Sequence, residues 1–387
     1  MRFQILNTLL HCLAFYMGAG IGSFLNVVIY RLPLGISVNN PRRSFCPSCK
    51  YKIPMWQNIP LLSWLLLRGQ CANCGGKISI RYFLVELLTG VMFYLVFLKV
   101  TAEYSVGGNP WPYLQAWGPQ VLCLWLFMSL LISGTFIDID HFILPHTITI
   151  GGAVAGVLCA WGVPALVAET EHTRGLLISL ASAGLGFGGL WAVVELGKLA
   201  FGRKKYVFVK EESWEVTQPD ENEPPVVVFA EHRYDWQDLF MRASDRMVIS
   251  CTSLQVNDRS FGAVTAELWM EKLKVREGTE LHEIPLEGVS KLKAMATQVV
   301  IPREAMGFGD VLFLMMIGAF TGWQAVLFTI LAASVIGTVF AVIHRITGKA
   351  EWGAKIPFGP YLALGAAIWV FYGPQFVDWY FSKVMWR

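Results

Sequence analysis

The sequence predicts an α-helical polytopic membrane protein with about eight transmembrane helices, a cytoplasmic zinc-binding loop of four cysteines and an inserted β-rich cytoplasmic domain. Hydrophobic residues make up 55% of the chain and charged residues only 15%, against about 25% charged residues in soluble proteins. Apolar runs of about 20 residues, the length that crosses a bilayer, alternate with polar connections. The net charge of +3 is too small and too dispersed to indicate a nucleic-acid partner.

The candidate spans are residues 5–30, 83–100, 118–137, 147–167, 175–200, 310–321, 323–344 and 357–376. The segment 310–321 is too short to cross a hydrocarbon core of about 30 Å unaided. Such a segment is typical of a helix that lines protein or a water-filled cavity. The first span lacks a small-residue cleavage site, so we expect a retained anchor. Its small residues in "GAGIGSFLN" favour close helix packing over a phosphate-binding loop.

Basic residues orient the chain in the membrane. The segment between the first two spans contains Arg31, Arg42, Arg43, Lys50, Lys52, Arg68, Lys77 and Arg81, with no acidic residue before Glu86. Short loops rich in lysine and arginine stay in the cytoplasm. We therefore expect residues 31–82 to be cytoplasmic, and counting spans puts Asp138, Asp310 and residues 202–303 on the same side.

Four cysteines in this loop form two C-x-x-C pairs. Cys46 and Cys49 precede Cys71 and Cys74 at a spacing that suits a tetrahedral four-cysteine zinc site. A reducing cytoplasm disfavours disulfides and so favours metal ligation. A thiol redox pair is the alternative.

Two aspartates, Asp138 in "FIDIDHFILPHTIT" and Asp310 in "AMGFGDVLFLMMIG", stand at the rims of apolar helices. Carboxylates at such positions usually face a cavity, a partner or a substrate. Two carboxylates that share a proton can act as general base and general acid in an aspartic protease. We assign Gly307, Gly309 and Asp140 supporting roles in these motifs, and we expect the glycines to let the backbone turn tightly and a substrate strand approach the carboxylate. The alternative is a pair of acids that only flank helices at the headgroup level.

The segment 202–303 carries many of the charged residues and alternates polar with β-branched residues, as in "RMVISCTSLQV". This pattern predicts strands, and hence a small β-rich domain. We expect Trp214, Tyr234, Trp236 and Phe240 to belong mainly to its core. Its role as a partner-binding or substrate-presenting module, or as a tolerated insertion, stays open.

The predicted organisation is a first transmembrane helix at 1–30, the zinc-binding loop at 31–82, helices two to five with the first aspartate at 83–201, the β-rich domain at 202–303, and the G-x-G-D motif with the last three helices at 304–387.

Five motifs carry a resemblance to a known family. They are "GAGIGSFLNVVIYRLP", the cysteine segment from "FCPSCK" to "VELLTG", "FIDIDHFILP", "EAMGFGDV" and "IPFGPYLALGA". The motifs occur in the same order as in bacterial type IV prepilin peptidases, which are leader peptidases and N-methyltransferases, and the chain resembles this family. The resemblance covers nearly all of residues 1–200 and 303–387.

The resemblance implies that Asp138, seven residues before Pro145, and Asp310 of the G-x-G-D motif are the catalytic aspartates. It implies cleavage of type IV prepilin or pseudopilin leaders at the cytoplasmic face of the bacterial inner membrane. It also implies methylation of the new N-terminus with S-adenosylmethionine, and a structural zinc ion in the cysteine loop. Expected partners are these substrates, membrane lipid and assembly proteins of a pilus or a type II secretion system.

The chain departs from the family motif G-x-G-D-x-K, because Leu312 stands where the lysine is usual. The intact aspartates still favour an active enzyme. A catalytically altered relative that serves as an assembly scaffold is one alternative. A proton-coupled transporter that uses the paired carboxylates is another, although transporters often show an internal repeat and none is recognised here.

Overall fold

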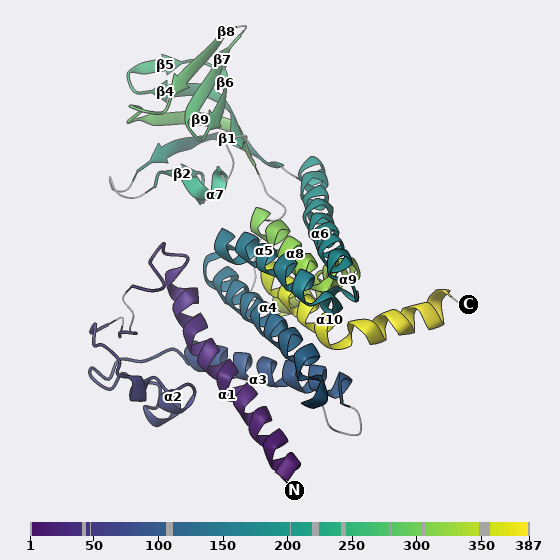
Figure 1. The fold of residues 1–387 in the computed structure, drawn as a ribbon. Helices are drawn as coiled ribbons and strands as arrows, with labels where there is room; N and C mark the ends of the chain where they lie inside the picture. Colours follow the sequence, from purple (N-terminus) through teal and green to yellow (C-terminus); the bar gives the residue numbers. More distant parts are fainter. Residues whose placement is uncertain are drawn as a thin grey trace. The chain divides into compact units, whose positions relative to one another are not determined.

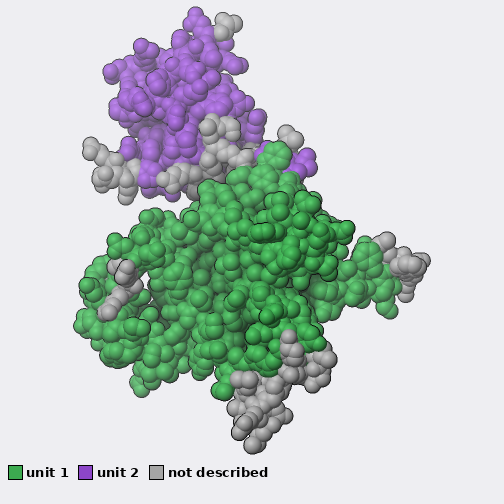
Figure 2. Space-filling view, viewed as in Figure 1, with its two compact units in different colours: residues 1–191, 307–387 green, residues 192–306 purple. Residues whose placement is uncertain are grey.

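The computed structural model describes residues 2–40, 44–46, 48–105, 111–201, 203–218, 224–240, 245–278, 280–302, 307–347 and 357–385. Arg42, Arg43 and parts of three motifs, namely Pro47, residues 304–306 and Ile356, lie outside these ranges. The chain folds as two compact units, residues 1–191 with 307–387, and residues 192–306 (Figure 2). The first unit is helical and the second is built on a β-sheet (Figure 1).

The first two long helices, α1 (Arg2–Arg31) and α3 (Ile80–Glu103), pack closely along one another. A Cβ atom at Gly18 would lie 2.7 Å from the carbonyl oxygen of Thr89, and one at Gly22 would lie 2.7 Å from Cα of Glu86. Such distances leave room only for glycine. The prediction that the small residues of this segment serve helix packing is therefore confirmed.

Helix α8 (Phe308–Thr321) is enclosed by protein. A Cβ atom on α5 (His146–Gly162) at Gly152 would lie 2.5 Å from Sδ of Met316. From α6 (His172–Phe201), Ser179 donates a hydrogen bond of 2.7 Å to the carbonyl oxygen of Ala319. At about 1.5 Å per residue, α8 is shorter than a bilayer core of about 30 Å. The neighbouring helices explain how so short an apolar helix is accommodated.

Five of the described helices are long and apolar enough to cross a membrane: α1, α3, α4 (Leu114–His141), α6 and α9 (Trp323–Ile346). Helices α5 and α8 are apolar but shorter. The last long helix is α10 (Gly359–Tyr380). Each of the ranges expected to be a span falls mainly on one of these helices. The predicted polytopic membrane protein is confirmed at this level.

The second unit contains one antiparallel sheet in the order β3-β2-β1-β9-β4-β6-β7-β8, with β5 paired to β4 (Figure 1). Its strands are β1 (Arg203–Thr217), β2 (Val226–Phe229), β3 (His232–Asp235), β4 (Arg246–Val256), β5 (Arg259–Phe261), β6 (Val264–Trp269), β7 (Lys272–Glu277), β8 (Glu280–Pro285) and β9 (Leu292–Pro302). A short helix, α7 (Trp236–Leu239), follows β3. The expected β-rich insertion is thus observed.

The chain enters and leaves this sheet at neighbouring positions. Strands β1 and β9 are partners, and their pairing begins with Arg203 opposite Pro302. Cα atoms of opposed residues in antiparallel strands are about 4.5–5.5 Å apart. The β unit is therefore attached through two chain segments that lie side by side.

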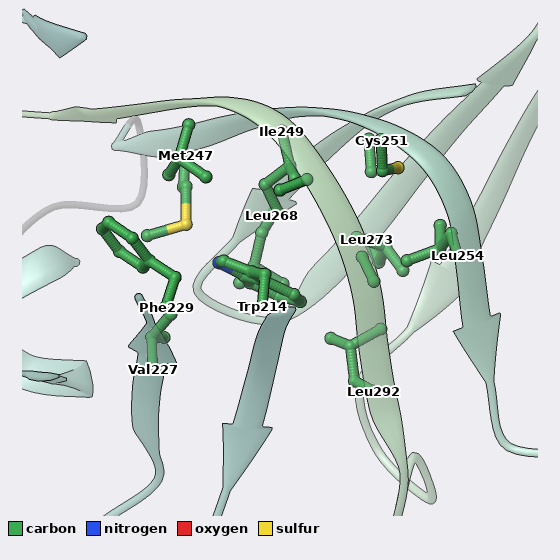
Figure 3. Close-up of a cluster of buried hydrophobic side chains, with 14 of the residues drawn as sticks. Trp214, Val227, Phe229, Met247, Ile249, Cys251, Leu254, Leu268, Leu273 and Leu292 are labelled. Atoms are coloured by element: carbon green, nitrogen blue, oxygen red, sulfur yellow. The ribbon is translucent and has the colours of Figure 1, made fainter. Parts of the chain in front are cut away.

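The buried face of the sheet forms a separate hydrophobic core (Figure 3). Trp214 of β1 and Phe229 of β2 are fully buried. Buried residues alternate with more exposed ones along β4, as the period of two predicts, except at Thr252 and Ser253, where the strand has a register shift. Phe240 is also buried, while Tyr234 and Trp236 are partly buried against the core. The expectation that these aromatic residues are core residues is confirmed.

Candidate active site and metal centre

Asp138 lies in the last turn of α4, with only 5% of its surface exposed. The helix ends at Phe142, which has a left-handed backbone (φ 54°) and donates its N–H to the carbonyl oxygen of Asp138 at 2.9 Å. This sharp end keeps the Asp138 side chain at the helix terminus and turns the chain toward α5.

The carboxylate of Asp138 faces the first turn of α10. The backbone N–H of Gly359 donates to Oδ2 of Asp138 at 3.0 Å, across 221 positions of sequence. Helix N-termini carry unpaired N–H groups and a partial positive charge, so they stabilise an ionised carboxylate. A Cβ atom at Gly359 would lie 2.7 Å from that same Oδ2. The close approach therefore requires glycine.

Asp310 lies in the first turn of α8, after Gly307 as the N-terminal cap. Its N–H donates to the carbonyl oxygen of Gly307 at 3.2 Å. Oδ1 of Asp310 is buried and has no hydrogen-bond partner among the described residues. A buried oxygen without a partner normally costs free energy, so it marks a position suited to a water molecule or a substrate group.

Leu144 joins the two aspartate sites. Its Cβ atom lies 3.0 Å from the position that a Cβ would take at Gly309, and its Cδ1 atom 3.4 Å from that at Gly359. Helices α4, α8 and α10 pack together here (Figure 1). Leu144 thus contacts both Gly309, the residue before Asp310, and Gly359, which binds Asp138. Two neighbouring carboxyl groups away from bulk water can share one proton.

Of the two glycines before Asp310, only Gly309 is required for its small size. Neither Gly307 nor Gly309 has a positive φ, so the expected tight turn through glycine flexibility is not what the structure contains. Gly309 instead makes room for Leu144. Leu312, at the position of the usual lysine, is 5% exposed within α8.

Asp140 points away from this buried site. It forms an ion pair with Arg81 at the start of α3, and both side chains are about a quarter exposed. Residues two positions apart on an α-helix are separated by about 200°. In the structure Asp140 thus links α4 to the start of α3.

The four cysteines lie on two turns that repeat the same backbone pattern. Phe45 bridges to Lys52, and Gln70 bridges to Lys77. In each turn the first cysteine donates its N–H to the carbonyl oxygen five positions later. The residue four positions after it has a positive φ, Lys50 in one turn and Gly75 in the other.

The four sulfur atoms are spaced like the ligands of a single metal ion. Sγ of Cys46 is 3.9 Å from that of Cys74, Sγ of Cys49 is 4.0 Å from that of Cys71, and all four lie within 4.8 Å of one another. Zinc–sulfur bonds of about 2.3 Å at the tetrahedral angle separate sulfurs by about 3.8 Å. The spacing of the four sulfur atoms therefore fits a tetrahedrally coordinated metal ion.

The backbone also favours the thiolate form of one ligand. N–H groups of Cys49 and Ser48 donate to the sulfur of Cys46 and lower the pKa of its thiol to about 6, against a smaller opposing effect of burial. Metals bind thiolates, so a lowered pKa favours ligation near neutral pH.

Comparisons with known proteins agree with this arrangement. Residues 16–100 match the model of the bacterial peptidase A24 N-terminal domain, and residues 283–342 match that of the type IV leader peptidase family. The prepilin leader peptidase/N-methyltransferase of Stutzerimonas stutzeri is 27% identical over 386 residues, which cover 94% of this chain and 90% of the relative. That of Myxococcus xanthus is 42% identical over 147 residues, 38% of this chain and 39% of the relative.

A relative of the same name from Neisseria gonorrhoeae is 35% identical over 218 residues, 49% of this chain and 67% of that protein. The chain belongs to the prepilin leader peptidase family. No solved structure gives a significant match. The two family models include the four cysteines and Asp310, respectively, whereas Asp138 and Gly359 lie outside the matched ranges.

Three residues that contact the aspartate motifs were not assigned from sequence. Gly359 lies in a quoted motif, and its Gly-Pro pair is a usual helix start, but its N–H bond to Asp138 depends on tertiary structure. Leu144 looks like any apolar loop residue. Arg81 was counted only as a basic residue, although it pairs with Asp140.

Proposed function

We propose that this chain is a membrane-embedded aspartic endopeptidase that removes the leader peptides of type IV prepilins or pseudopilins, with Asp138 and Asp310 as its catalytic pair. The observation that carries the proposal is the convergence of two buried carboxyl groups across Leu144, in a member of the leader peptidase family. Carboxyl pairs of this kind activate water and protonate a leaving group in aspartic proteases.

The hydrogen bonds suggest a role for each carboxyl group. Oδ2 of Asp138 accepts the Gly359 N–H at a helix N-terminus, which favours the ionised form. Asp138 then takes a proton from water as the water oxygen adds to the scissile carbonyl carbon. Asp310 carries the shared proton and gives it to the substrate. That proton goes to the carbonyl oxygen, which yields a tetrahedral diol. Asp138 then gives its proton to the nitrogen, Asp310 takes a proton back from the diol, and the C–N bond breaks to release the amine and the carboxylic acid.

The finer topology belongs to the same proposal. The apolar runs support eight spans. The basic residues of the cysteine loop support a cytoplasmic location, in a bacterial inner membrane, for this loop, the β unit and both aspartates. The names of the relatives suggest a second activity, methylation of the new N-terminus with S-adenosylmethionine. Assembly proteins of a pilus or a type II secretion system are the proposed further partners.

The decisive experiment is coexpression with a type IV prepilin, followed by mass spectrometry of the N-terminus of the pilin. Loss of the leader is the expected result, and an added methyl group reports the second activity separately. An intact leader, with this chain correctly inserted, would instead support the scaffold suggested by Leu312.

We also propose that Cys46, Cys49, Cys71 and Cys74 hold a structural zinc ion. Their sulfur spacing supports this, as do the two matching backbone turns. When bound, zinc joins the two turns and so contributes to folding of the loop.

We expect one zinc ion per purified chain by elemental analysis. Cys49→Ser should lower the metal content and make the loop more sensitive to proteases, because a closed structural site contributes folding free energy. Cys251→Ser is the matched control, since Cys251 is buried in the β unit, outside the cluster. Equal metal content in both variants, or a metal-free loop that resists proteolysis, would contradict the zinc proposal.

The β unit is proposed to be an accessory module. Replacement of residues 205–300 by a short flexible linker should preserve membrane insertion, because Arg203 and Pro302 are paired neighbours and no apolar helix is removed. Prepilin cleavage in detergent should stay within about threefold of the wild type, a change of less than about 1 kcal/mol.

Processing in cells is the separate readout for the β unit. A fall in cells with normal activity in detergent would indicate partner recruitment or substrate presentation. A variant that inserts normally but cannot cleave purified prepilin would show that the β unit helps to form the active site, against the accessory role.

A further inference from the structure

The β unit contains the end of the apolar helix α6. It comprises residues 192–306, so the last part of α6, residues 192–201, belongs to it. Helix α6 is long and apolar enough to cross a membrane, and Val193 and Leu196 in this part are exposed. Strand β1 begins at Arg203, two residues after α6 ends, and a step of two residues spans at most about 7 Å. The start of β1 therefore lies close to the membrane surface.

This start of β1 is strongly basic. Arg203, Lys204, Lys205 and Lys210 are all exposed, and the first acidic residue of the strand is Glu211. Among the described residues, the side chains of Arg203, Lys205 and Lys210 have no ion-pair partner. A cluster of four or more basic residues directly after a membrane-spanning helix is typical of segments that bind anionic lipid.

Two exposed valines lie beside these charges. Successive side chains of a strand point to opposite sides, so residues 203, 205, 207 and 209 share one side of β1. Val207 is 66% exposed and Val209 is fully exposed. On the other side of the strand, Tyr206 and Phe208 pack against the core of the β unit. The outer side of β1 therefore combines basic and apolar side chains.

The apolar surface continues onto the next two strands. Val300 of β9 lies opposite Lys205, and Val248 of β4 lies opposite Val300. Both valines are half-buried, whereas Val299 and Ile249 beside them are buried in the core, so Val300 and Val248 point outward. We call this surface the basic-apolar patch, and it comprises Arg203, Lys204, Lys205, Val207, Val209, Lys210, Val248 and Val300.

A break in strand pairing displays the valines of β1. The pairing of β1 with β9 is interrupted between Val207 and Glu212, and β2 pairs with β1 only from Trp214 onward. Lysines and bulges at such places also protect an open strand edge from aggregation. Exposed valines give no such protection, because removing them from water is favourable. The apolar part of the patch therefore indicates a partner surface.

We propose that the basic-apolar patch binds the anionic surface of the membrane that α6 crosses. Its basic residues contact lipid phosphate groups, and its valines enter the headgroup layer. Basic charge close to an anionic membrane and apolar side chains at the membrane boundary both add to such binding. The direct connection to α6 keeps the patch near this surface, whereas a soluble partner must be captured from solution. Anionic lipid then holds the β unit at the membrane.

A photo-crosslinking residue at position 209 tests the contact in the full-length, zinc-loaded chain. Benzoylphenylalanine fits in place of Val209, because that side chain is fully exposed. The chain is placed in nanodiscs of phosphatidylglycerol and phosphatidylcholine, or of phosphatidylcholine alone, and lipid adducts are measured by mass spectrometry. Each basic residue favours docking about fivefold. We therefore expect adducts in the anionic nanodiscs and at least about tenfold fewer in the zwitterionic ones.

The same probe in place of Leu281 is the matched control. Leu281 is 55% exposed on β8, and four strands of the sheet lie between β8 and β1. It should give no lipid adducts above background. Lipid adducts at position 281 as abundant as those at position 209 would show contact without a specific surface and would overturn the proposal.

A charge variant separates binding from proximity. Lys204→Gln with Lys205→Gln removes two charges and keeps polar side chains, so the ratio of docked to free β unit should fall about 25-fold. Lys272→Gln with Lys274→Gln is its control, since these lysines of β7 pair with Glu283 outside the patch. The control should crosslink as the parent does. Prepilin cleavage in detergent should be unchanged in both variants, so the peptidase function is tested separately.

Three further results would overturn the proposal. Equal adduct yields in anionic and zwitterionic nanodiscs would exclude recognition of anionic lipid. Unchanged yields in the variant with Lys204→Gln and Lys205→Gln would exclude a role for the basic residues. In cells, crosslinks from position 209 to another protein in place of lipid would assign the patch to a protein partner.

Discussion

Prepilin cleavage by the Asp138→Asn and Asp310→Asn variants is expected to fall by about 10²–10⁴-fold, the usual contribution of a positioned acid or base. Asparagine keeps the size of the side chain and can still accept the Gly359 N–H at position 138. It can neither take a proton from water nor return one to the substrate. The variants should therefore insert and fold normally while the chemical step fails.

The combined variant sharpens this test. Groups that act as one unit are not additive, because removing either already disables the step. Asp138→Asn with Asp310→Asn should thus be little slower than either single variant. Initial rates with purified prepilin in detergent, with leader loss read by mass spectrometry, provide the measurement.

Asp140→Asn is the internal control, since it removes a carboxylate from the same turn of α4. Asp140 pairs with Arg81 outside the buried site, so its loss should cost less than about tenfold, in the range of an exposed ion pair. Full activity of Asp138→Asn would remove Asp138 from the catalytic pair. A larger defect in Asp140→Asn than in Asp138→Asn would assign the catalytic role to Asp140.

Sequence patterns predicted those features that depend on local chemistry. The apolar runs predicted the long helices, because a membrane span needs about 20 apolar residues. The paired cysteines predicted the group of four sulfur atoms that could hold a metal, since each C-x-x-C already lies within one turn. Period-two alternation gave strands such as β4. Each of these signals is contained in a short segment.

Contacts between residues that lie far apart in the sequence could not be predicted from local patterns. Strands β1 and β9 pair across nearly the whole insertion, and no local pattern specifies that partner. Glu86 appeared only as the first acid after a basic loop, because its burial depends on α1 and the residues around Leu61. Gly309 was expected to allow a tight turn and the approach of a substrate, whereas in the structure the absence of a side chain makes room for Leu144.

Gly359→Ala tests the least expected part of the site. A Cβ atom there would lie 2.7 Å from Oδ2 of Asp138, closer than side-chain atoms approach. The carboxylate or the start of α10 must then move, and a misplacement of about 1 Å can cost about 100-fold in rate. We therefore expect prepilin cleavage to fall by roughly this factor.

Stability should change little, which separates this effect from misfolding. Alanine favours a helix over glycine by about 1 kcal/mol, and Gly359 lies in the first turn of α10 without a positive φ. The thermal midpoint of Gly359→Ala should therefore not fall by more than a few degrees. Gly184→Ala on α6 is the matched control, since a Cβ there meets no atom within 4 Å, and it should cleave normally. Wild-type cleavage by Gly359→Ala would show that Asp138 works without the close approach of α10, and the proposed role of that helix N-terminus would be wrong.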